Sequence, residues 1–251
     1  MRRMIKNKKR LWTNILFVIL SLLVLILLTV FLLEPNSLSF LKNKPGGTSS
    51  SSEMTSSQAT ELPLPQVSSK DWELILVNRD HPTDLVPPSL TKLETVEVDS
   101  RIAQAAKEFL EAVRQIEPAE ELISGYRSKE SQAELYNEAI AAGEAEGLSH
   151  EEAEAEVRKQ IQVPGASEHQ TGLALDISPA AGQSDELAAK ISLLAPDYGF
   201  VLRYPKDKSE ITGVDFENWH YRYVGKESAR YMQAHNLVLE EYLARLQAAG
   251  R

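Results

Sequence analysis

Cysteine is absent from this 251-residue sequence. The absence excludes disulfide bonds, and it also excludes anchoring to a membrane through a lipid-modified cysteine. If the folded part of the chain lies outside the cell, it must be stabilised by its own hydrophobic core, by a bound metal ion, or by both.

Charged residues are absent from residues 11–33, which are nearly all aliphatic or aromatic. A membrane-spanning helix needs about 20 such residues. Residues 1–10 carry six positive side chains and no acidic one, and a positive flank of this kind stays in the cytoplasm. The pattern predicts a cytoplasmic basic tail at 1–10 and a transmembrane anchor at 11–33. The rest of the chain is then extracytoplasmic.

A cleavable signal peptide is the alternative interpretation of this segment. Its apolar core spans about 7–15 residues and ends at a small-x-small cleavage motif. The apolar run of this sequence is longer, and Glu34, Pro35 and Asn36 follow it. The sequence therefore favours an uncleaved, single-pass anchor in the cell membrane.

Apolar residues are scarce over much of residues 34–70, where Gly46, Gly47 and many serine and threonine residues occur. A segment of this composition buries too little apolar surface to fold. As a flexible Gly/Ser-rich coil it extends roughly 35 Å. We expect a disordered Ser/Thr-rich linker at 34–70 and one folded domain at 71–251, which acts in the cell wall next to its own membrane.

Basic residues are too few after residue 33 to favour an anionic partner. Once the six in the tail are set aside, 21 basic residues remain against 36 acidic ones. This balance excludes nucleic acid and anionic lipid surfaces as partners of the folded domain. Many of the acidic residues lie between Glu144 and Glu156, a stretch typical of a solvated helix face.

The hydrophobic periodicity predicts short helices and strands in irregular order. Strands are expected at 72–77, 173–177, 200–204 and 219–224, and helices at 102–116, 129–142, from 149 onward, 185–194 and 237–250. Ser100 is a candidate N-cap of the first helix, and Ser149 with Glu152 forms a capping box. This order indicates an α+β fold with a small antiparallel sheet and flanking helices.

Histidine is rare, with five in the sequence, so each can be considered in turn. His81 precedes a proline, His150 lies in the first turn of an acidic helix, and His235 lies near a helix end. These three are typical of surface or capping positions. His169 and His220 lie in different surroundings.

His169 belongs to the loop PGASEHQTG (164–172), which leads into the expected strand LALDI (173–177). On that strand the leucine and isoleucine side chains share one face, and Asp176 lies on the other. An acidic side chain within an apolar strand is costly unless it is paired or binds a metal. From the strand alone, backbone donors and a metal ion are equally good partners for Asp176.

His220 belongs to the segment ENWHYRYV (217–224), in which Trp219, Tyr221 and Tyr223 alternate with it. The alternation predicts that the aromatic row packs into the core and that His220 points the other way. Glu217, three residues earlier, faces away from His220 on a straight strand. The two residues share a site only if the chain turns just before the strand.

Two histidines and one carboxylate are a usual protein ligand set for catalytic zinc, with the fourth position left for water. His169, Asp176 and His220 supply this set, and Glu217 is the candidate general base. The motif H-E-x-x-H is absent, which excludes the thermolysin-like arrangement. His-x6-Asp and Glu-x2-His are weak signals separately and moderately specific together.

Three segments resemble the VanY-type D-alanyl-D-alanine carboxypeptidases: SGYRSKESQAELY (124–136), PGASEHQTGLALDIS (164–178) and GFVLRYPKDKSEITGVDFENWHYRYVG (199–225). They resemble equally the related wall L,D-carboxypeptidases of Gram-positive bacteria. The resemblance extends over roughly residues 72–245. Residues 141–160 are the least similar part, and we interpret them as an insertion near the cleft.

The resemblance implies a zinc-binding α+β fold in which His169, Asp176 and His220 are the ligands and Glu217 is the catalytic base. It implies that Arg127 binds the substrate and stabilises the developing oxyanion. Three further positions match residues near the substrate: Gln132, Tyr136 and Ser167. Without the resemblance, Arg127 is typical of a structural ion pair at a helix start.

Four functions are compatible with the sequence. By resemblance we expect a zinc D,D-carboxypeptidase that removes the terminal D-alanine from peptidoglycan stem peptides or their precursors. The alternative is an L,D-carboxypeptidase that trims tetrapeptide stems to tripeptides with the same ligands. A non-catalytic wall-binding domain is disfavoured because no ligand is lost, and a released phage-type lysin is disfavoured by the expected anchor and the acidic domain.

Overall fold

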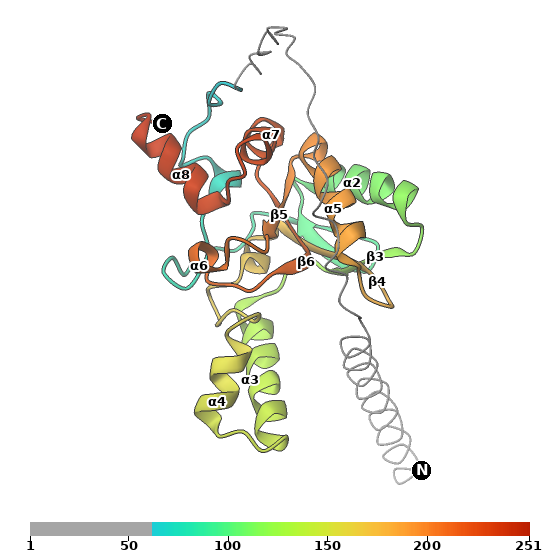
Figure 1. Ribbon diagram of the computed structural model, residues 1–251, viewed down its shortest axis with the longest axis vertical. Helices are drawn as coiled ribbons and strands as arrows, with labels where there is room; N and C mark the ends of the chain where they lie inside the picture. The colour runs from blue at the N-terminus through green and yellow to red at the C-terminus, as the bar shows by residue number, and fades with distance from the viewer. Residues whose placement is uncertain (1–61) are drawn as a thin grey trace, which may run out of the picture. The chain divides into compact units, whose positions relative to one another are not determined.

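A four-stranded antiparallel sheet organises the part of the chain that the computed structural model describes, residues 62–251 (Figure 1). The strand order is β3-β4-β6-β5. The strands are β3 (Glu120–Ser124), β4 (Ala174–Pro179), β5 (Phe200–Tyr204) and β6 (Glu217–Tyr223). A separate antiparallel hairpin pairs β1 (Leu90–Leu93) with β2 (Val96–Asp99). The predicted α+β class is confirmed.

Helices flank the sheet and account for most of the remaining elements. They are α2 (Ala103–Ile116), α3 (Lys129–Ala145), α4 (His150–Val157), α5 (Asp185–Leu194), α6 (Ser209–Thr212), α7 (Lys226–Ala234) and α8 (Leu239–Ala248). Residues 62–251 also contain the short 3-10 helices η1 (Trp72–Leu74), η2 (Glu168–Thr171) and η3 (Ala195–Tyr198). The predicted capping box at Ser149 and Glu152 is present, and it begins α4.

One predicted strand and one predicted cap were wrong. Residues 72–77 begin with the 3-10 helix η1, and the carbonyls of Glu73 and Ile75 accept hydrogen bonds from Arg222 instead of a neighbouring strand. Ser100 does not cap α2, whose first turn begins after Ile102 without a side-chain cap. Five further elements were not expected from the sequence: β1, β2, β3, α6 and α7.

The main core lies on one face of the sheet. Leu173, Leu175 and Ile177 at β4 are buried there together with Phe109 of α2 and Tyr221 of β6, as the alternation on β4 predicts. A second core joins Val201 and Val224 to side chains of α7 and α8. The opposite face of β4 and β6 is left for polar side chains, and the functional site forms there.

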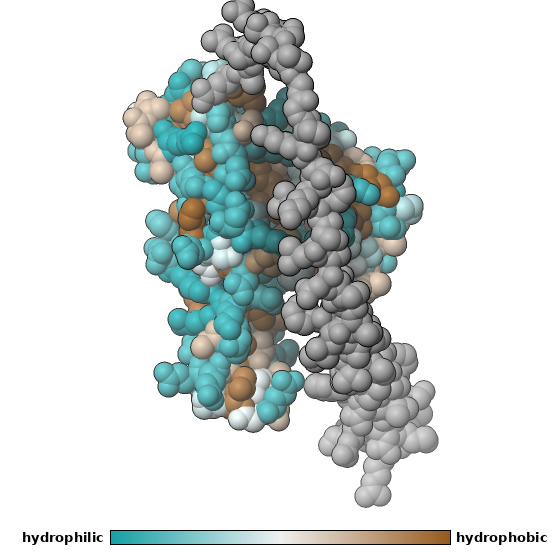
Figure 2. All heavy atoms as spheres, viewed as in Figure 1, coloured by the Kyte–Doolittle hydropathy of each residue, from teal (hydrophilic) through white to brown (hydrophobic). Residues whose placement is uncertain are grey.

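Helices α3 and α4 form a hairpin that extends away from the sheet at the bottom of Figure 1. A small separate core between the two helices is formed by Tyr136, Ile140 and Ala153. Most acidic residues between Glu144 and Glu156 are exposed, as predicted for a solvated helix face. Hydrophilic residues also predominate over the uncovered part of the face shown in Figure 2.

Residues 62–70, assigned to the linker from the sequence, pack against the second core and the C-terminal residue of the chain. Leu64 and Val67 contact the second core, and the Arg251 guanidinium donates a hydrogen bond of 2.8 Å to the Leu64 carbonyl. Ser69 Oγ donates to the Arg251 carbonyl at 2.7 Å. The folded unit therefore begins earlier than residue 71.

The predicted basic tail at 1–10, the anchor at 11–33 and the linker up to residue 61 lie outside the described residues. Within residues 62–251, no helix combines the length and the apolar character that crossing a bilayer requires.

Candidate zinc centre

Strands β4 and β6 bring Asp176 and His220 together because these residues are direct cross-strand partners. Side chains opposite each other in an antiparallel pair point to the same face, with Cβ atoms about 5 Å apart. Asp176 Oδ1 lies 3.2 Å from His220 Nδ1. Both side chains lie on the face turned away from the main core.

The 3-10 helix η2 places His169 beside this pair. The helix ends at Gly172, where φ is 69°, and a Cβ there would lie 2.8 Å from the backbone nitrogen of Asp99. His169 Nε2 lies 3.3 Å from Asp176 Oδ2, and its Nδ1 lies 2.7 Å from the Gly125 carbonyl. Because a carbonyl only accepts hydrogen bonds, Nδ1 carries the proton and Nε2 has a free lone pair.

The three predicted ligands thus share one site, and their donor atoms all lie within 4.8 Å of one another. Burial by itself raises the pKa of the Asp176 carboxyl, but the two imidazoles hold it well below its usual range. Asp176 Oδ1 is buried without a hydrogen-bond partner among the described residues. Two imidazole nitrogens and one buried carboxylate oxygen match the ligand chemistry of zinc.

The charge around His220 also suits a divalent cation. Burial alone lowers its pKa, but the adjacent carboxylates of Asp176, Glu168 and Glu217 raise the pKa to about 10. The pocket is therefore rich in negative charge around two nitrogen ligands. A bound cation supplies the positive charge that such a site favours.

A bulge within β6 brings Glu217 to the same face as His220. Leu202 of β5 pairs with Tyr221, whereas Tyr204 pairs with Glu217, so β6 has extra residues between the two pairs. Glu217 Oε2 lies 3.5 Å from His220 Nδ1. The sequence predicted a turn of the chain just before the strand as the condition for Glu217 and His220 to share a site. In the structure, the bulge that meets this condition lies within β6.

The carboxyl of Glu217 has a strongly shifted titration. Burial raises its pKa to about 7, and the carboxylates of Asp176 and Glu168 act in the same direction against His220 and Arg127. A carboxyl with a pKa near 7 can both accept and return a proton near neutral pH. This is the behaviour expected of a general base.

The bulge also removes Trp219 from the aromatic row that was predicted to be core. Tyr221 is fully buried in the main core and Tyr223 packs against it, but Trp219 lines the cleft beside the zinc ligands. The prediction that Trp219, Tyr221 and Tyr223 all pack into the core was therefore wrong for Trp219, because the bulge interrupts the alternation of side chains along β6.

Arg127 lies in the cleft and is held by two neighbours. Its guanidinium donates to Gln132 Oε1 at 2.9 Å and to Ser124 Oγ at 2.7 Å. Gln132 Nε2 in turn donates to the Gln162 carbonyl at 2.6 Å. Both ends of the Gln132 amide are therefore occupied within the protein, and this residue positions Arg127. Ser167 is buried and lines the cleft, as expected from the resemblance.

Tyr136 does not line the cleft. Its hydroxyl donates to Glu154 at 3.0 Å and accepts from Arg158 Nε at 3.1 Å, so it joins α3 to α4. The expectation that Tyr136 lies near the substrate is corrected by these contacts. Its position on α3, one turn beyond Gln132, faces the α4 side of the hairpin.

The cleft has a volume of about 170 Å³. Its lining includes the zinc ligands, Glu217 and Arg127, together with residues that the sequence analysis did not select: Glu168, Tyr204, Trp219 and the segment 160–162. A larger hollow of about 800 Å³ lies between η1 and α8 and is lined by Trp72 and Leu243. The smaller cleft contains the converging titratable groups and is therefore the candidate active site.

Comparison with known proteins agrees with this geometry. The family model VanY, described as D-alanyl-D-alanine carboxypeptidase, matches residues 95–226. A D-alanyl-D-alanine carboxypeptidase of Enterococcus faecalis is 40% identical over 178 residues, which cover 69% of this chain and 66% of that protein. The chain belongs to the VanY family. Its resemblance in sequence to this family is confirmed.

Solved structures of VanY-like proteins have the same fold. The vancomycin-resistance D,D-pentapeptidase VanY, crystallised as a mutant in complex with Zn(II), is 39% identical with a TM-score of 0.64 over 69% of this chain and 99% of that one. The L,D-carboxypeptidase LdcB is 30% identical with a TM-score of 0.55 over 68% of this chain and 86% of that one. The VanY match and the ligand set together support zinc as the cofactor.

Proposed function

We propose that this VanY-family protein is a zinc-dependent D-alanyl-D-alanine carboxypeptidase that removes the terminal D-alanine from peptidoglycan stem peptides. One observation carries the proposal. The cross-strand pair Asp176–His220, the loop residue His169 and the bulge residue Glu217 converge in one buried cleft. Hydrolysis of a peptide bond needs such a combination of metal ligands and an unligated base.

His169, Asp176 and His220 would hold the zinc ion. When bound, zinc polarises a carbonyl oxygen and lowers the pKa of a coordinated water to about 7. Glu217 accepts the proton of the attacking water and returns it to the leaving amine of D-alanine. Its buried position, beside His220, keeps the carboxyl within the cleft where both transfers occur.

Arg127 contributes positive charge opposite the base. Its guanidinium is held rigidly by Ser124 and Gln132, and donors held in place beforehand stabilise a developing oxyanion without reorganisation. The planar guanidinium also suits the terminal carboxylate of a peptide, which it can bind through paired hydrogen bonds. Binding the chain end explains why such an enzyme removes one terminal residue.

The L,D-carboxypeptidase activity is the second candidate, and it uses the same ligands and base. The match to LdcB favours it less than the match to the D,D-pentapeptidase, because both identity and TM-score are lower. The two activities differ in the handedness of the residue before the scissile bond. A methyl group of the wrong hand in a small pocket costs roughly 1–3 kcal/mol, so a mixed activity is compatible with this cleft.

Matched peptides distinguish the two candidates. We expect kcat/KM to be higher for a stem pentapeptide ending in D-Ala-D-Ala than for the corresponding tetrapeptide in the same buffer. Mass spectrometry identifies the released products. Faster cleavage of the tetrapeptide would assign the L,D activity, and cleavage of neither peptide would contradict both assignments.

We also propose that residues 11–33 anchor the protein in the cell membrane, with residues 1–10 in the cytoplasm and the catalytic domain outside. The uncharged apolar run and its basic flank support this arrangement. The full chain should remain in the membrane fraction after alkaline carbonate extraction, and a variant without residues 1–33 should not. Release of the full chain would contradict the anchor.

A further inference from the structure

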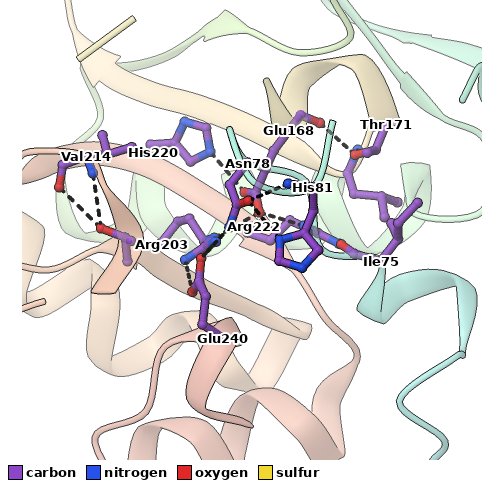
Figure 3. A network of polar contacts seen from close by, with 12 residues as sticks. Ile75, Asn78, His81, Glu168, Thr171, Arg203, Val214, His220, Arg222 and Glu240 are labelled. Carbon is purple, nitrogen blue, oxygen red and sulfur yellow. Dashed lines mark hydrogen bonds and ion pairs between the residues drawn. The ribbon is translucent and has the colours of Figure 1, made fainter. Parts of the chain in front are cut away.

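A buried ion network lies next to the zinc ligand His220 (Figure 3). Its centre is Glu168, a residue of η2 with 1% exposure that immediately precedes the ligand His169. Glu168 Oε1 accepts hydrogen bonds from Arg203 Nε at 2.8 Å and from Arg222 Nη1 at 2.7 Å. Burial acts to raise the pKa of Glu168, but the two guanidinium groups hold it well below its usual range.

The other oxygen of Glu168 faces the zinc ligand His220. Oε2 lies 3.5 Å from His220 Nε2, and neither atom has a hydrogen-bond partner among residues 62–251. A buried polar atom without a hydrogen-bond partner destabilises the folded state. A hydrogen bond between these two atoms, which face each other, would remove that cost for both. Figure 3 shows the Glu168 carboxylate between the imidazole on one side and the arginines on the other.

We propose that Glu168 is a positioning residue that sets the tautomer and orientation of His220 for zinc binding. This inference rests on the proposed zinc centre. The Glu168 carboxylate is placed to accept a hydrogen bond from the His220 Nε2–H, which leaves Nδ1, the nitrogen nearest to Asp176 and Glu217, for the metal. The Gly125 carbonyl does the same for Nδ1 of His169 and leaves Nε2 for the metal. Each histidine ligand is thereby held through its other nitrogen.

Only a carboxylate satisfies both sides of this position. The arginines donate to one oxygen of Glu168, and the other oxygen faces His220 Nε2 at 3.5 Å, where it would accept the imidazole N–H. Glutamine has the same size, but one end of its amide is a donor. A glutamine at position 168 therefore loses either its acceptor for the arginines or its acceptor for the imidazole.

The arginines are held from behind, which makes the carboxylate rigid. Arg203 makes two hydrogen bonds to Glu240 of α8, at 2.9 and 2.6 Å. Arg222 donates to the Glu73 and Ile75 carbonyls at 3.0 and 2.8 Å. Glu240 is thus a member of the same network that does not touch His220, and it provides a matched control.

The test measures zinc affinity by competition with a chromophoric chelator, using the full chain and the variants Glu168→Gln and Glu240→Gln. We expect Glu168→Gln to bind zinc roughly 10–100-fold more weakly and Glu240→Gln to bind it within about threefold of the natural protein. Equal affinities in the two variants would overturn the positioning role. If the natural protein bound no zinc, the proposed function itself would fail.

A second measurement needs no variant and decides the case if Glu168→Gln does not fold. Long-range ¹H–¹⁵N correlation spectra of the zinc-loaded protein report which ring nitrogen of each histidine carries a proton. We expect a proton on Nε2 of His220 and on Nδ1 of His169. Zinc on Nε2 of His220, or no proton there, would overturn the inference while leaving the zinc centre intact.

Discussion

Glu217 is needed for turnover but not for binding the metal. Its carboxyl lies beside His220 but is not one of the three ligands that converge on the metal position. The zinc site is formed by the cross-strand pair and the η2 turn, which do not depend on Glu217. Loss of the Glu217 carboxylate therefore affects proton transfer and leaves the ligand set unchanged.

We predict that Glu217→Gln retains zinc and the folded structure but loses about 10²–10⁴-fold in kcat/KM. Steady-state kinetics on the pentapeptide, with zinc content measured on the same sample, checks this. Glu210→Gln, an exposed glutamate on α6, is the control and should be fully active. Near-normal turnover by Glu217→Gln would make Glu217 a structural carboxylate.

Glu120 of β3 provides a prediction about stability and pH. Its carboxylate is 1% exposed and has no hydrogen-bond partner in the described part of the chain. Burial raises its pKa to about 7 from an ordinary value of 4.5, and the nearby Glu117 adds to the shift against Arg114. Between these two values the folded state binds more protons than the unfolded state, so this residue makes the protein less stable as pH rises.

Replacing Glu120 by glutamine should remove this dependence. Relative to the natural protein, Glu120→Gln should gain about 1–3 kcal/mol in the free energy of unfolding between pH 4.5 and pH 8. Urea unfolding at several pH values measures the difference. Glu121→Gln, at the exposed neighbouring position on β3, should show no such trend. If the free energy of unfolding of Glu120→Gln changed with pH in parallel with that of the natural protein, the raised pKa of Glu120 would be contradicted.

The α3–α4 hairpin illustrates how a correct helix assignment can still misplace a side chain. Residues 129–142 were predicted as a helix, and α3 contains them. The resemblance placed both Gln132 and Tyr136 near the substrate. Residues four apart lie on the same side of a helix, but Tyr136 packs against Ala153 of α4 and bonds to Glu154, whereas Gln132 bonds to Arg127 in the cleft. The contact with α4 is a tertiary feature that the helical pattern does not contain.

Two substitutions on α3 should therefore differ in effect. We predict that Tyr136→Phe leaves kcat/KM unchanged and lowers the free energy of unfolding by about 0.5–1.5 kcal/mol, because the hydrogen bond to Glu154 is lost. Gln132→Leu should lower kcat/KM because Arg127 loses its support. Peptide kinetics and urea unfolding of both variants provide the measurements. A large loss of turnover in Tyr136→Phe would return Tyr136 to the substrate site.

The zinc ligands could be predicted from the sequence, but the bulge and the buried carboxylate that position the site could not. The period-two pattern of β4 placed Asp176 opposite the core, and the register with β6 bears this out. The bulge that turns Glu217 and Trp219 toward the cleft depends on pairing with β5, which a single strand does not reveal. Glu168 had one available signal: Arg203 and Arg222 lie within the strands β5 and β6, and an arginine buried in a sheet requires an acidic partner.

The boundary of the folded unit is a property of the whole domain. Residues 62–70 resemble a linker by sequence, yet Leu64 and Val67 pack on the second core and Arg251 binds the Leu64 carbonyl. These contacts join the beginning and the end of the domain. Local composition does not report them, because the partner residues lie at the other end of the chain.

Two truncated proteins test this boundary. A protein that begins at residue 62 should match the full chain in activity on soluble peptides and in stability. One that begins at residue 71 should keep its zinc ligands but lose roughly 1–3 kcal/mol in the free energy of unfolding, because apolar surface of the second core is exposed. Thermal and urea unfolding distinguish the two. Equal stability would place the boundary at residue 71 after all.

Zinc bound by His169, Asp176 and His220 is the central feature of this domain, and zinc analysis of protein purified without chelators tests it most directly. We predict about one zinc ion per chain in the natural protein and very little in His169→Ala and His220→Ala. Glu217→Gln should retain the full amount. Absence of zinc from the natural protein, or an unchanged amount in His169→Ala, would contradict the assignment.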